Sequence, residues 1–254
     1  MNPDVLLGIA EDIVERGDRE GVRLRLFGSL GIRRHITTSV GLLELLGRVP
    51  TRDIDFMGYS ADQERADRLF AELGYQADHA VSHSLEYGIQ RLIYHQREDQ
   101  LMAEVFLDEL RMAHTLDFRG RLELDYPTLS LADLLLTKLQ IQQITEKDIK
   151  DMIALLAEHD VGSDGPEVVD ESRLLALTGD DWGLFYTATK NLHTVEEWAR
   201  GLDALEPALQ RGVVEKTGAL ISKMETQPKS RRWKLRAKIG TRVRWYEEVG
   251  DVHR

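Results

Sequence analysis

Strand patterns occur only before Pro127 in this chain, and the patterns after that residue are helical. The first strand pattern alternates apolar and polar side chains with period two, which is typical of a half-buried strand. Strand patterns cover residues 22–27, 53–57, 88–95 and 101–107, and a weaker one covers 121–126. Strands followed by helices favour the α+β class, because a Rossmann repeat would alternate the two along the chain.

Two domains are therefore predicted, a mixed-sheet α/β domain at residues 1–127 and an all-helical domain at 128–254. Periodic apolar residues predict helices in both domains, over 3–18, 61–73, 131–139, 146–158, 167–176, from about 181, and over 209–225. Residues 162–166 contain two glycines and a proline, which is typical of a linker.

Charge and composition narrow the class of protein. The 254 residues include 33 basic and 44 acidic side chains, giving a formal net charge of −11, which disfavours a protein that coats DNA. The absence of cysteine excludes disulfides, thiolate metal sites and cysteine nucleophiles. The apolar run at 129–141 is too short to cross a bilayer, and acids among the first residues do not fit a signal peptide. We therefore expect a cytoplasmic protein.

The residues most suggestive of chemistry are a Gly-Ser pair after the first strand and two aspartates on the next. Gly28 permits close approach to a phosphate, and the Ser29 hydroxyl can donate to phosphate oxygens. Asp53 and Asp55 are two residues apart, so a strand directs both to one face. Paired carboxylates of this kind favour Mg²⁺, although an isolated Asp-x-Asp is more often a solvated strand end.

A third acid is expected on the strand at 101–107. Glu104 lies between Ala103 and Val105, where an acid is unusual unless it is paired, and Asp108 shares its face with period two. The alternative for Glu104 is an edge-strand side chain that faces water.

With these residues the chain resembles the nucleotidyltransferase superfamily related to DNA polymerase β. That family has Gly-Ser after a strand, then Asp-x-Asp, then a third carboxylate on a neighbouring strand. The resemblance implies that Asp53, Asp55 and Glu104 are catalytic and bind two Mg²⁺ ions, and that Gly28 and Ser29 bind the nucleotide. The 23 residues between Ser29 and Asp53 exceed the compact family spacing, so this segment forms a loop or an extra helix.

The helices after Pro127 are similar to those of the AbiEii-like toxin nucleotidyltransferases. That likeness implies that Lys138 contacts nucleotide phosphates and that Asp148 and Asp151 support the site. A lysine that reaches solvent along its helix, and two aspartates that cap or solvate the next helix, are the structural alternatives. Gln142 and Gln143 stand where the toxin branch often has an arginine.

The implied reaction is the transfer of a nucleoside monophosphate from an NTP, ATP included, to an acceptor hydroxyl, with release of pyrophosphate. RNA such as tRNA, a small alcohol such as an aminoglycoside, and a protein hydroxyl stay open as acceptors. The alternative is a catalytically silent binding module of the same fold.

A basic segment at residues 223–244 carries nine basic residues, one acid and Trp233, and Trp245 follows it directly. Basic residues interleaved with aromatics favour RNA binding, and a solvated helix packed through Trp233 and Leu235 is the alternative. Among the histidines, His79 and His83 are four residues apart without a third ligand nearby, so a solvated loop is favoured. His35 and His114 show no evident partner in the sequence and receive no role.

Overall fold

The computed structural model contains helices and a mixed β-sheet, and the chain divides into two compact units. The structure describes residues 2–37, 39, 41–48, 53–78, 91–96, 100–163, 165 and 167–248. The first unit comprises residues 1–34, 50–111 and 115–130, and the second comprises 35–49, 112–114 and 131–254. Each unit is described below by itself, and the division into domains at Pro127 stays a prediction. Every helix in the described part lacks the length or apolarity that a bilayer crossing requires.

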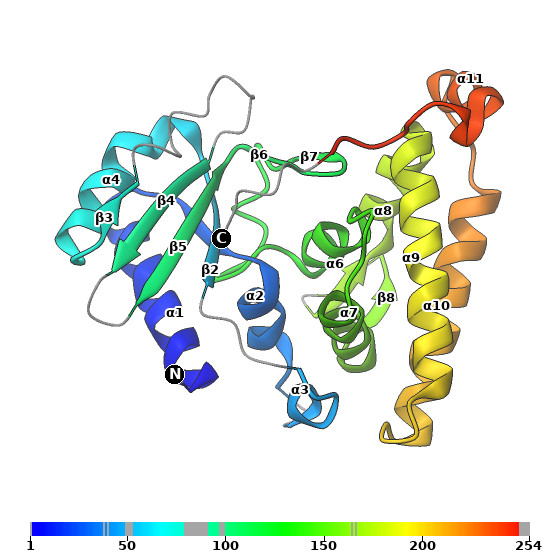
Figure 1. The fold of residues 1–254 in the computed structure, drawn as a ribbon, viewed down its shortest axis with the longest axis horizontal. Coiled ribbons are helices and arrows are strands. Elements are labelled where there is room, and N and C mark those ends of the chain that lie inside the picture. Colours follow the sequence, from blue (N-terminus) through cyan, green and yellow to red (C-terminus); the bar gives the residue numbers. More distant parts are fainter. Residues whose placement is uncertain are drawn as a thin grey trace. The chain divides into compact units, whose positions relative to one another are not determined.

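The first unit is built on a five-stranded sheet in the order β1-β2-β5-β4-β3 (Figure 1). Its strands are β1 (Leu24–Leu26), β2 (Asp53–Gly58), β3 (Gln76–Ala77), β4 (Arg91–Gln96) and β5 (Leu101–Leu107). Only β2 and β5 pair in parallel, whereas the other neighbours are antiparallel. The expected mixed sheet is therefore confirmed.

Helices cover one face of this sheet because their apolar stripes need a surface to bury. They are α1 (Pro3–Arg19) and α4 (Gln63–Glu72), the latter preceded by the 3-10 turn η1 (Ser60–Asp62). Their buried residues join a core with alternate strand positions, among them Ile13, Phe70, Ile54, Phe56, Ala103 and Val105. A strand turns successive side chains to opposite faces, so the positions between these core residues lie on the other face.

Two further elements belong to this unit. A hairpin of β6 (Glu109–Arg111) and β7 (Thr115–Asp117) follows the sheet. The helix α2 (Gly28–His35) directly follows β1, so the segment after Ser29 begins as a helix. Residues 28–34 of α2 belong to this unit, and His35 belongs to the second unit. The strand predicted at 121–126 was wrong, because these residues form turns. Pro127–Leu129 instead pairs with the edge strand β1, where the Leu26 N–H donates to the Pro127 carbonyl and the Leu129 N–H to the Leu26 carbonyl.

The second unit is mainly helical. Its helices are α3 (Leu42–Leu45), α6 (Leu131–Leu139), α7 (Glu146–Glu158), α8 (Glu171–Asp180), α9 (Trp182–Gly201), α10 (Pro207–Thr226) and α11 (Arg231–Ile239), with the 3-10 turn η3 (Gly240–Arg242). The helix α10 packs against α7 and α9, and α8 packs against α9. Buried apolar side chains such as Leu135, Leu155 and Leu192 fill the unit.

The all-helical prediction for residues 128–254 was wrong. Two short parallel strands, β8 (Asp160–Gly162) and β9 (Val168–Asp170), flank the expected linker. Val161 pairs with Val169, and β-branched side chains of this kind favour extended backbone. As a result the helix predicted at 167–176 starts later, where the Asp170 side chain accepts a hydrogen bond from the Ser172 N–H.

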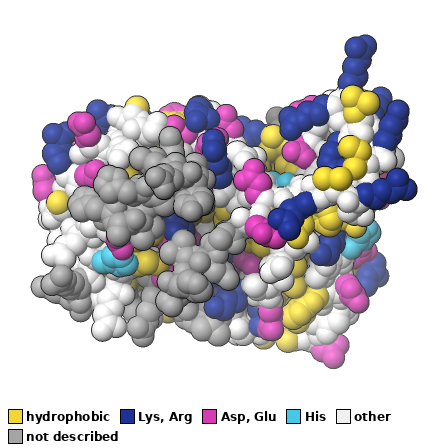
Figure 2. Space-filling model, turned by 45° about the horizontal axis from the view of Figure 1, so that its top comes forward, with side chains coloured by type: hydrophobic (Ala, Val, Ile, Leu, Met, Phe, Trp, Pro, Cys, Tyr) yellow, Lys and Arg dark blue, Asp and Glu magenta, His cyan; other side chains and the backbone are white. Residues whose placement is uncertain are grey.

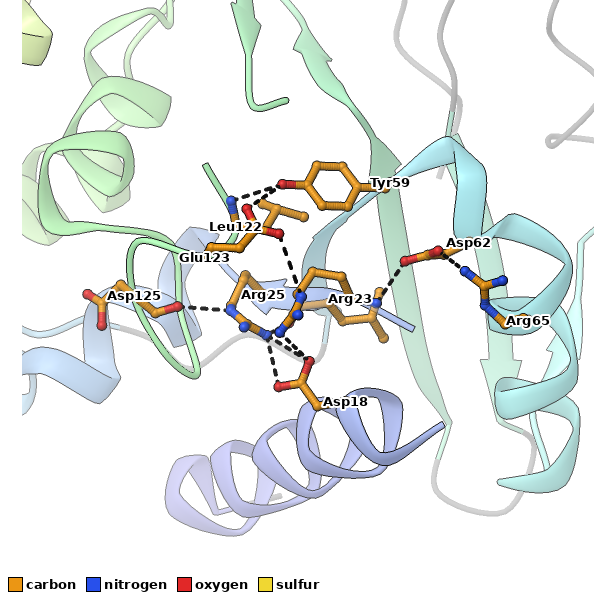
Figure 3. Close-up of polar contacts among 10 residues, drawn as sticks. Asp18, Arg23, Arg25, Tyr59, Asp62, Arg65, Leu122, Glu123 and Asp125 are labelled. Carbon is orange, nitrogen blue, oxygen red and sulfur yellow. Dashed lines mark hydrogen bonds and ion pairs between the residues drawn. The ribbon is translucent and has the colours of Figure 1, made fainter. Parts of the chain in front are cut away.

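The strand β1 was predicted to be half-buried, and it is buried at every position. Arg25 is only 3% exposed. Its Nε donates to the Asp125 carbonyl at 2.9 Å and its Nη1 lies 3.3 Å from Asp18 Oδ2 (Figure 3). Its guanidinium also covers the Tyr126 ring. Neighbouring Arg23 also contacts Asp18, at 3.1 Å, but is 40% exposed. The charge of Arg25 is thus satisfied inside the fold.

We predict that Arg25→Ala destabilises the chain by about 2–4 kcal/mol, because it breaks a buried ion pair and leaves a carbonyl without its donor. The matched control Arg23→Ala removes a half-exposed arginine from the same strand and should cost less than about 1 kcal/mol. Urea unfolding of both variants measures the difference. Equal losses would contradict a structural role for the buried guanidinium.

Candidate active site

Three carboxylates share the face of the central strands that lies opposite the core with α1 and α4. Asp53 and Asp55 alternate with the core residues Ile54 and Phe56 along β2. In the parallel pairing of β2 with β5, Asp55 lies opposite Glu104. All three acids are partly exposed. The structure therefore brings the acids that were predicted to be catalytic to one face of the sheet. The strand register that places them there is set by the apolar side chains buried on the opposite face.

Gly28 packs directly against this face. The Phe27 N–H donates to the Asp55 carbonyl at 3.0 Å, which fixes the chain where α2 begins. Gly28 has a φ of +64°, and a Cβ at this position would lie 2.3 Å from Asp55 Oδ2. Only glycine fits both conditions. Ser29 follows in the first turn of α2 and is partly exposed.

Glu104 has an ion-pair partner that the sequence did not reveal. Arg91 Nη1 on β4 lies 3.1 Å from Glu104 Oε2, and the two side chains are 19% and 15% exposed. The strands β4 and β5 are antiparallel, with Ile93 opposite Glu104. The prediction that an acid inside an apolar strand needs a partner is met by this arginine. Its identity follows only from the strand register.

Asp108, the alternative to Glu104 as the third acid, forms hydrogen bonds to a turn instead. It follows β5 with a φ of +63° and accepts hydrogen bonds from the Ser60 N–H at 3.1 Å and the Ser60 hydroxyl at 2.6 Å. Its carboxylate holds the turn after β2. Glu104, not Asp108, is therefore the strand acid that lies opposite Asp55.

The donor set of this face suits Mg²⁺, because carboxylate oxygens are the ligands that this ion takes in proteins. Among the described residues, however, Asp53, Asp55 and Glu104 do not form a group whose ligand oxygens all lie within 4.8 Å of one another. Mg²⁺ usually retains several waters and uses one or two carboxylates with substrate phosphates, so it does not need such a closed group.

The second unit contains the other predicted site residues. Lys138 Nζ on α6 lies 2.8 Å from Asp148 Oδ1 and 3.0 Å from Asp151 Oδ2, both on α7. Burial alone would lower the pKa of Lys138, but the charges of Asp151 and Asp148 outweigh it and raise the pKa. Burial likewise opposes ionisation of Asp148, yet Lys138 and Thr145 hold the pKa of Asp148 below its usual value. The three predicted residues thus form one network.

Both alternatives for the aspartates apply only in part. Asp148 does cap α7, since its side chain forms a capping box with Thr145. Asp151 is not solvated, because it is 1% exposed and also accepts from Arg48 Nε at 2.7 Å. Arg48 is a second cation that the sequence did not reveal. It lies in the segment after α3, where neither helical periodicity nor motif spacing points to α7.

The basic segment 223–244 forms the end of α10, all of α11 and η3. Trp233 in this segment and Trp245 directly after it are used for packing, because Trp233 contacts the Phe185 ring and Trp245 contacts the Tyr186 ring. Leu235 was expected to pack, but its exposed fraction is 65%. Ile239 and Val243 are also exposed, at 46% and 58%. Figure 2 shows Lys and Arg side chains beside hydrophobic ones where α11 lies. The segment presents a mixed basic and apolar surface rather than stacking aromatics.

Two of the histidines, His35 and His114, have partners that the sequence did not reveal. His79 and His83 lie outside the described residues. His114 Nε2 lies 2.8 Å from the Thr187 hydroxyl, and burial lowers its pKa against the opposing charge of Asp181. His35, which was given no partner, lies 3.4 Å from Glu167 through its Nδ1. Both histidines therefore have structural partners that are far from them in the sequence.

Comparison of the chain with protein-family models, with curated proteins and with solved structures found no match.

We predict that Gly28→Ala is more destabilising than Gly74→Ala. Both glycines have positive φ, so alanine is strained at either position by about 1 kcal/mol. A Cβ at Gly74 meets nothing within 4 Å, whereas a Cβ at Gly28 meets the Asp55 carboxylate. The clash should add at least about 1 kcal/mol. Thermal unfolding compares the two variants, and equal destabilisation would contradict the close packing on Asp55.

We also predict that Lys138→Met lowers the free energy of unfolding by about 3 kcal/mol, because it leaves buried Asp151 with one cation fewer. Lys190→Met on α9 is the matched control, since Lys190 is exposed and its loss should cost less than about 0.5 kcal/mol. Urea unfolding measures both. Unchanged stability of Lys138→Met would show that the network contributes nothing to the fold.

Proposed function

We propose that this chain is a Mg²⁺-dependent nucleotidyltransferase that moves a nucleoside monophosphate from an NTP to an acceptor hydroxyl. The observation that carries the proposal is the position of Asp53, Asp55 and Glu104 on one sheet face, with Gly28 packed against Asp55. A purely structural ion pair would not require so close an approach of backbone to a carboxylate. The resemblance to nucleotidyltransferases adds the reaction class.

Each residue has a task in this proposal. Asp53, Asp55 and Glu104 would hold Mg²⁺, which neutralises phosphate charge and stabilises the attacking and leaving oxygens. The Ser29 hydroxyl and nearby amides of α2 donate to phosphate oxygens of the NTP. The acceptor oxygen forms a bond to the α-phosphorus, and the bond from that phosphorus to the β-phosphate oxygen breaks, so that pyrophosphate leaves. The hydroxyl proton passes to Glu104.

Arg91 fits this scheme as a positioning residue. Its guanidinium donates to Glu104 Oε2 at 3.1 Å and so holds the carboxylate on the face that carries Asp55. By the likeness to AbiEii-like toxins, Lys138 contacts nucleotide phosphates, and Asp148 and Asp151 orient its ammonium. On the basis of the same likeness, we propose that this chain is the toxin of a toxin–antitoxin pair.

RNA is the acceptor that the basic segment favours. Arg231, Arg232, Lys234, Lys238 and Arg242 are exposed, and cations on a surface attract a phosphate backbone. A labelling experiment would distinguish RNA from the other two acceptors, a small alcohol and a protein hydroxyl.

A second candidate function is a silent binding module. The Arg91–Glu104 ion pair favours it, because an arginine neutralises the third carboxylate without a metal ion. Such a module would bind its partner without transferring a nucleotide.

We predict that Asp53→Asn or Asp55→Asn lowers transfer by about a hundredfold or more, since loss of a metal ligand removes several kcal/mol of charge stabilisation. The measurement follows label from α-labelled NTPs onto total RNA with Mg²⁺, and circular dichroism checks the fold. Asp12→Asn, an exposed change on α1, is the matched control and should retain full activity.

Full activity in either active-site variant would refute the assignment of the acids. Label on protein or on an added aminoglycoside instead of RNA would identify a different acceptor. An absence of NTP binding by the unaltered chain would support the silent module.

A further inference from the structure

A second cluster of ligand-type side chains lies within the second unit. His35 is the last residue of α2, His159 follows α7, and Glu167 precedes β9. The Nδ1 atoms of His35 and His159 lie 3.4 Å and 3.5 Å from the same oxygen, Glu167 Oε2. The three ligand atoms all lie within 4.8 Å of one another, and no other described group of three meets this criterion. Segments far apart in the chain thus converge on one point.

The hydrogen bonds of His159 indicate what this point can bind. Its Nε2 lies 3.0 Å from the His35 carbonyl, which can only accept, so Nε2 carries a proton and donates. Nδ1 also faces acceptors, the Glu167 carbonyl oxygen at 3.2 Å and Glu167 Oε2 at 3.5 Å. With acceptors at both ring nitrogens, a cation must lie at Nδ1, either a second proton on the ring or a metal ion.

The spacing fits a tetrahedral metal ion. Zn²⁺ binds histidine nitrogen at about 2.0–2.1 Å, which places neighbouring ligand atoms of a tetrahedron about 3.4 Å apart. The observed separations of 3.4 Å and 3.5 Å match this edge. The bond from His159 Nε2 to a backbone carbonyl is also the contact that metal-binding histidines usually make with their second nitrogen.

The burial of the three side chains and the elements of their ligand atoms indicate which metal ion fits the site. His35 and His159 are 6% and 4% exposed, whereas the Glu167 side chain is 66% exposed. Two imidazoles fix the site inside the unit, and the carboxylate reaches it from the solvent side, which leaves a path for entry. Two nitrogens and one oxygen favour Zn²⁺ or a similar transition metal over Mg²⁺ and Ca²⁺.

We propose that His35, His159 and Glu167 bind one divalent transition-metal ion, with Zn²⁺ as the best fit. The ligands are the two Nδ1 atoms and Glu167 Oε2, and a water or an added ligand completes the tetrahedron. The ion ties the end of α2 to the ends of α7 and β8–β9 inside the second unit. This site does not depend on the nucleotidyltransferase proposal.

Co²⁺ provides a direct test, because a tetrahedral nitrogen-containing site gives it intense visible absorption bands. The full chain, stripped with a chelator and supplied with excess Mg²⁺, should bind one Co²⁺ per chain with such bands, and Zn²⁺ should displace it. Glu167→Gln removes an exposed ligand without altering the core and should weaken binding at least about tenfold.

Glu215→Gln, a change of an exposed glutamate on α10, is the matched control and should bind as the unaltered chain does. Asp55→Asn should also bind normally, which separates this site from the proposed Mg²⁺ site. Absence of tetrahedral bands, or equal affinity of Glu167→Gln, would overturn the proposal. Loss of stability in Glu167→Gln without any metal uptake by the unaltered chain would likewise overturn it, leaving a histidine–glutamate ion pair.

Discussion

Parallel pairing of β2 with β5 is the constraint on which the first unit depends. Ile54 and Phe56 on one strand, and Ala103 and Val105 on the other, face the core beneath α1 and α4. A slip of one residue would turn these side chains to solvent and bury the acids between them. Burial of apolar surface on one face therefore fixes which residues meet on the other. The chemistry that we propose for Asp55 and Glu104 is a consequence of that packing.

Charges inside the fold occur in balanced groups. Lys138 and Arg48 face Asp148 and Asp151, two cations against two anions. Removing charges from water is costly, and their mutual attraction offsets the cost only when every member has its partner. The same logic applies to Arg25 with Asp18 and to Arg91 with Glu104. Each pair specifies one arrangement of segments that are distant in the sequence, because any other arrangement leaves a charge unpaired.

Features of short range could be predicted from the sequence, and features of long range could not. Period two along β2 places Asp53 and Asp55 on one face without any knowledge of the neighbours. Arg91 became a partner of Glu104 only through the antiparallel register of β4 with β5. His159 and Glu167 lack a local motif, and their meeting with His35 depends on how α7, β9 and the end of α2 pack. The strands β8 and β9 were missed because the glycines and proline between them indicated a linker.

The two proposed metal sites can coexist in one chain because their donors differ. The sheet face offers carboxylate oxygens alone, which suit an ion that is hard and retains its waters. The histidine cluster offers two imidazole nitrogens held by burial and by a backbone carbonyl, which suit a borderline ion with tetrahedral preference. Mg²⁺ gains little from imidazole, so a cell's excess of Mg²⁺ would not occupy the second site. In these two proposals, ligand chemistry rather than affinity alone would let one cysteine-free chain distinguish the two ions.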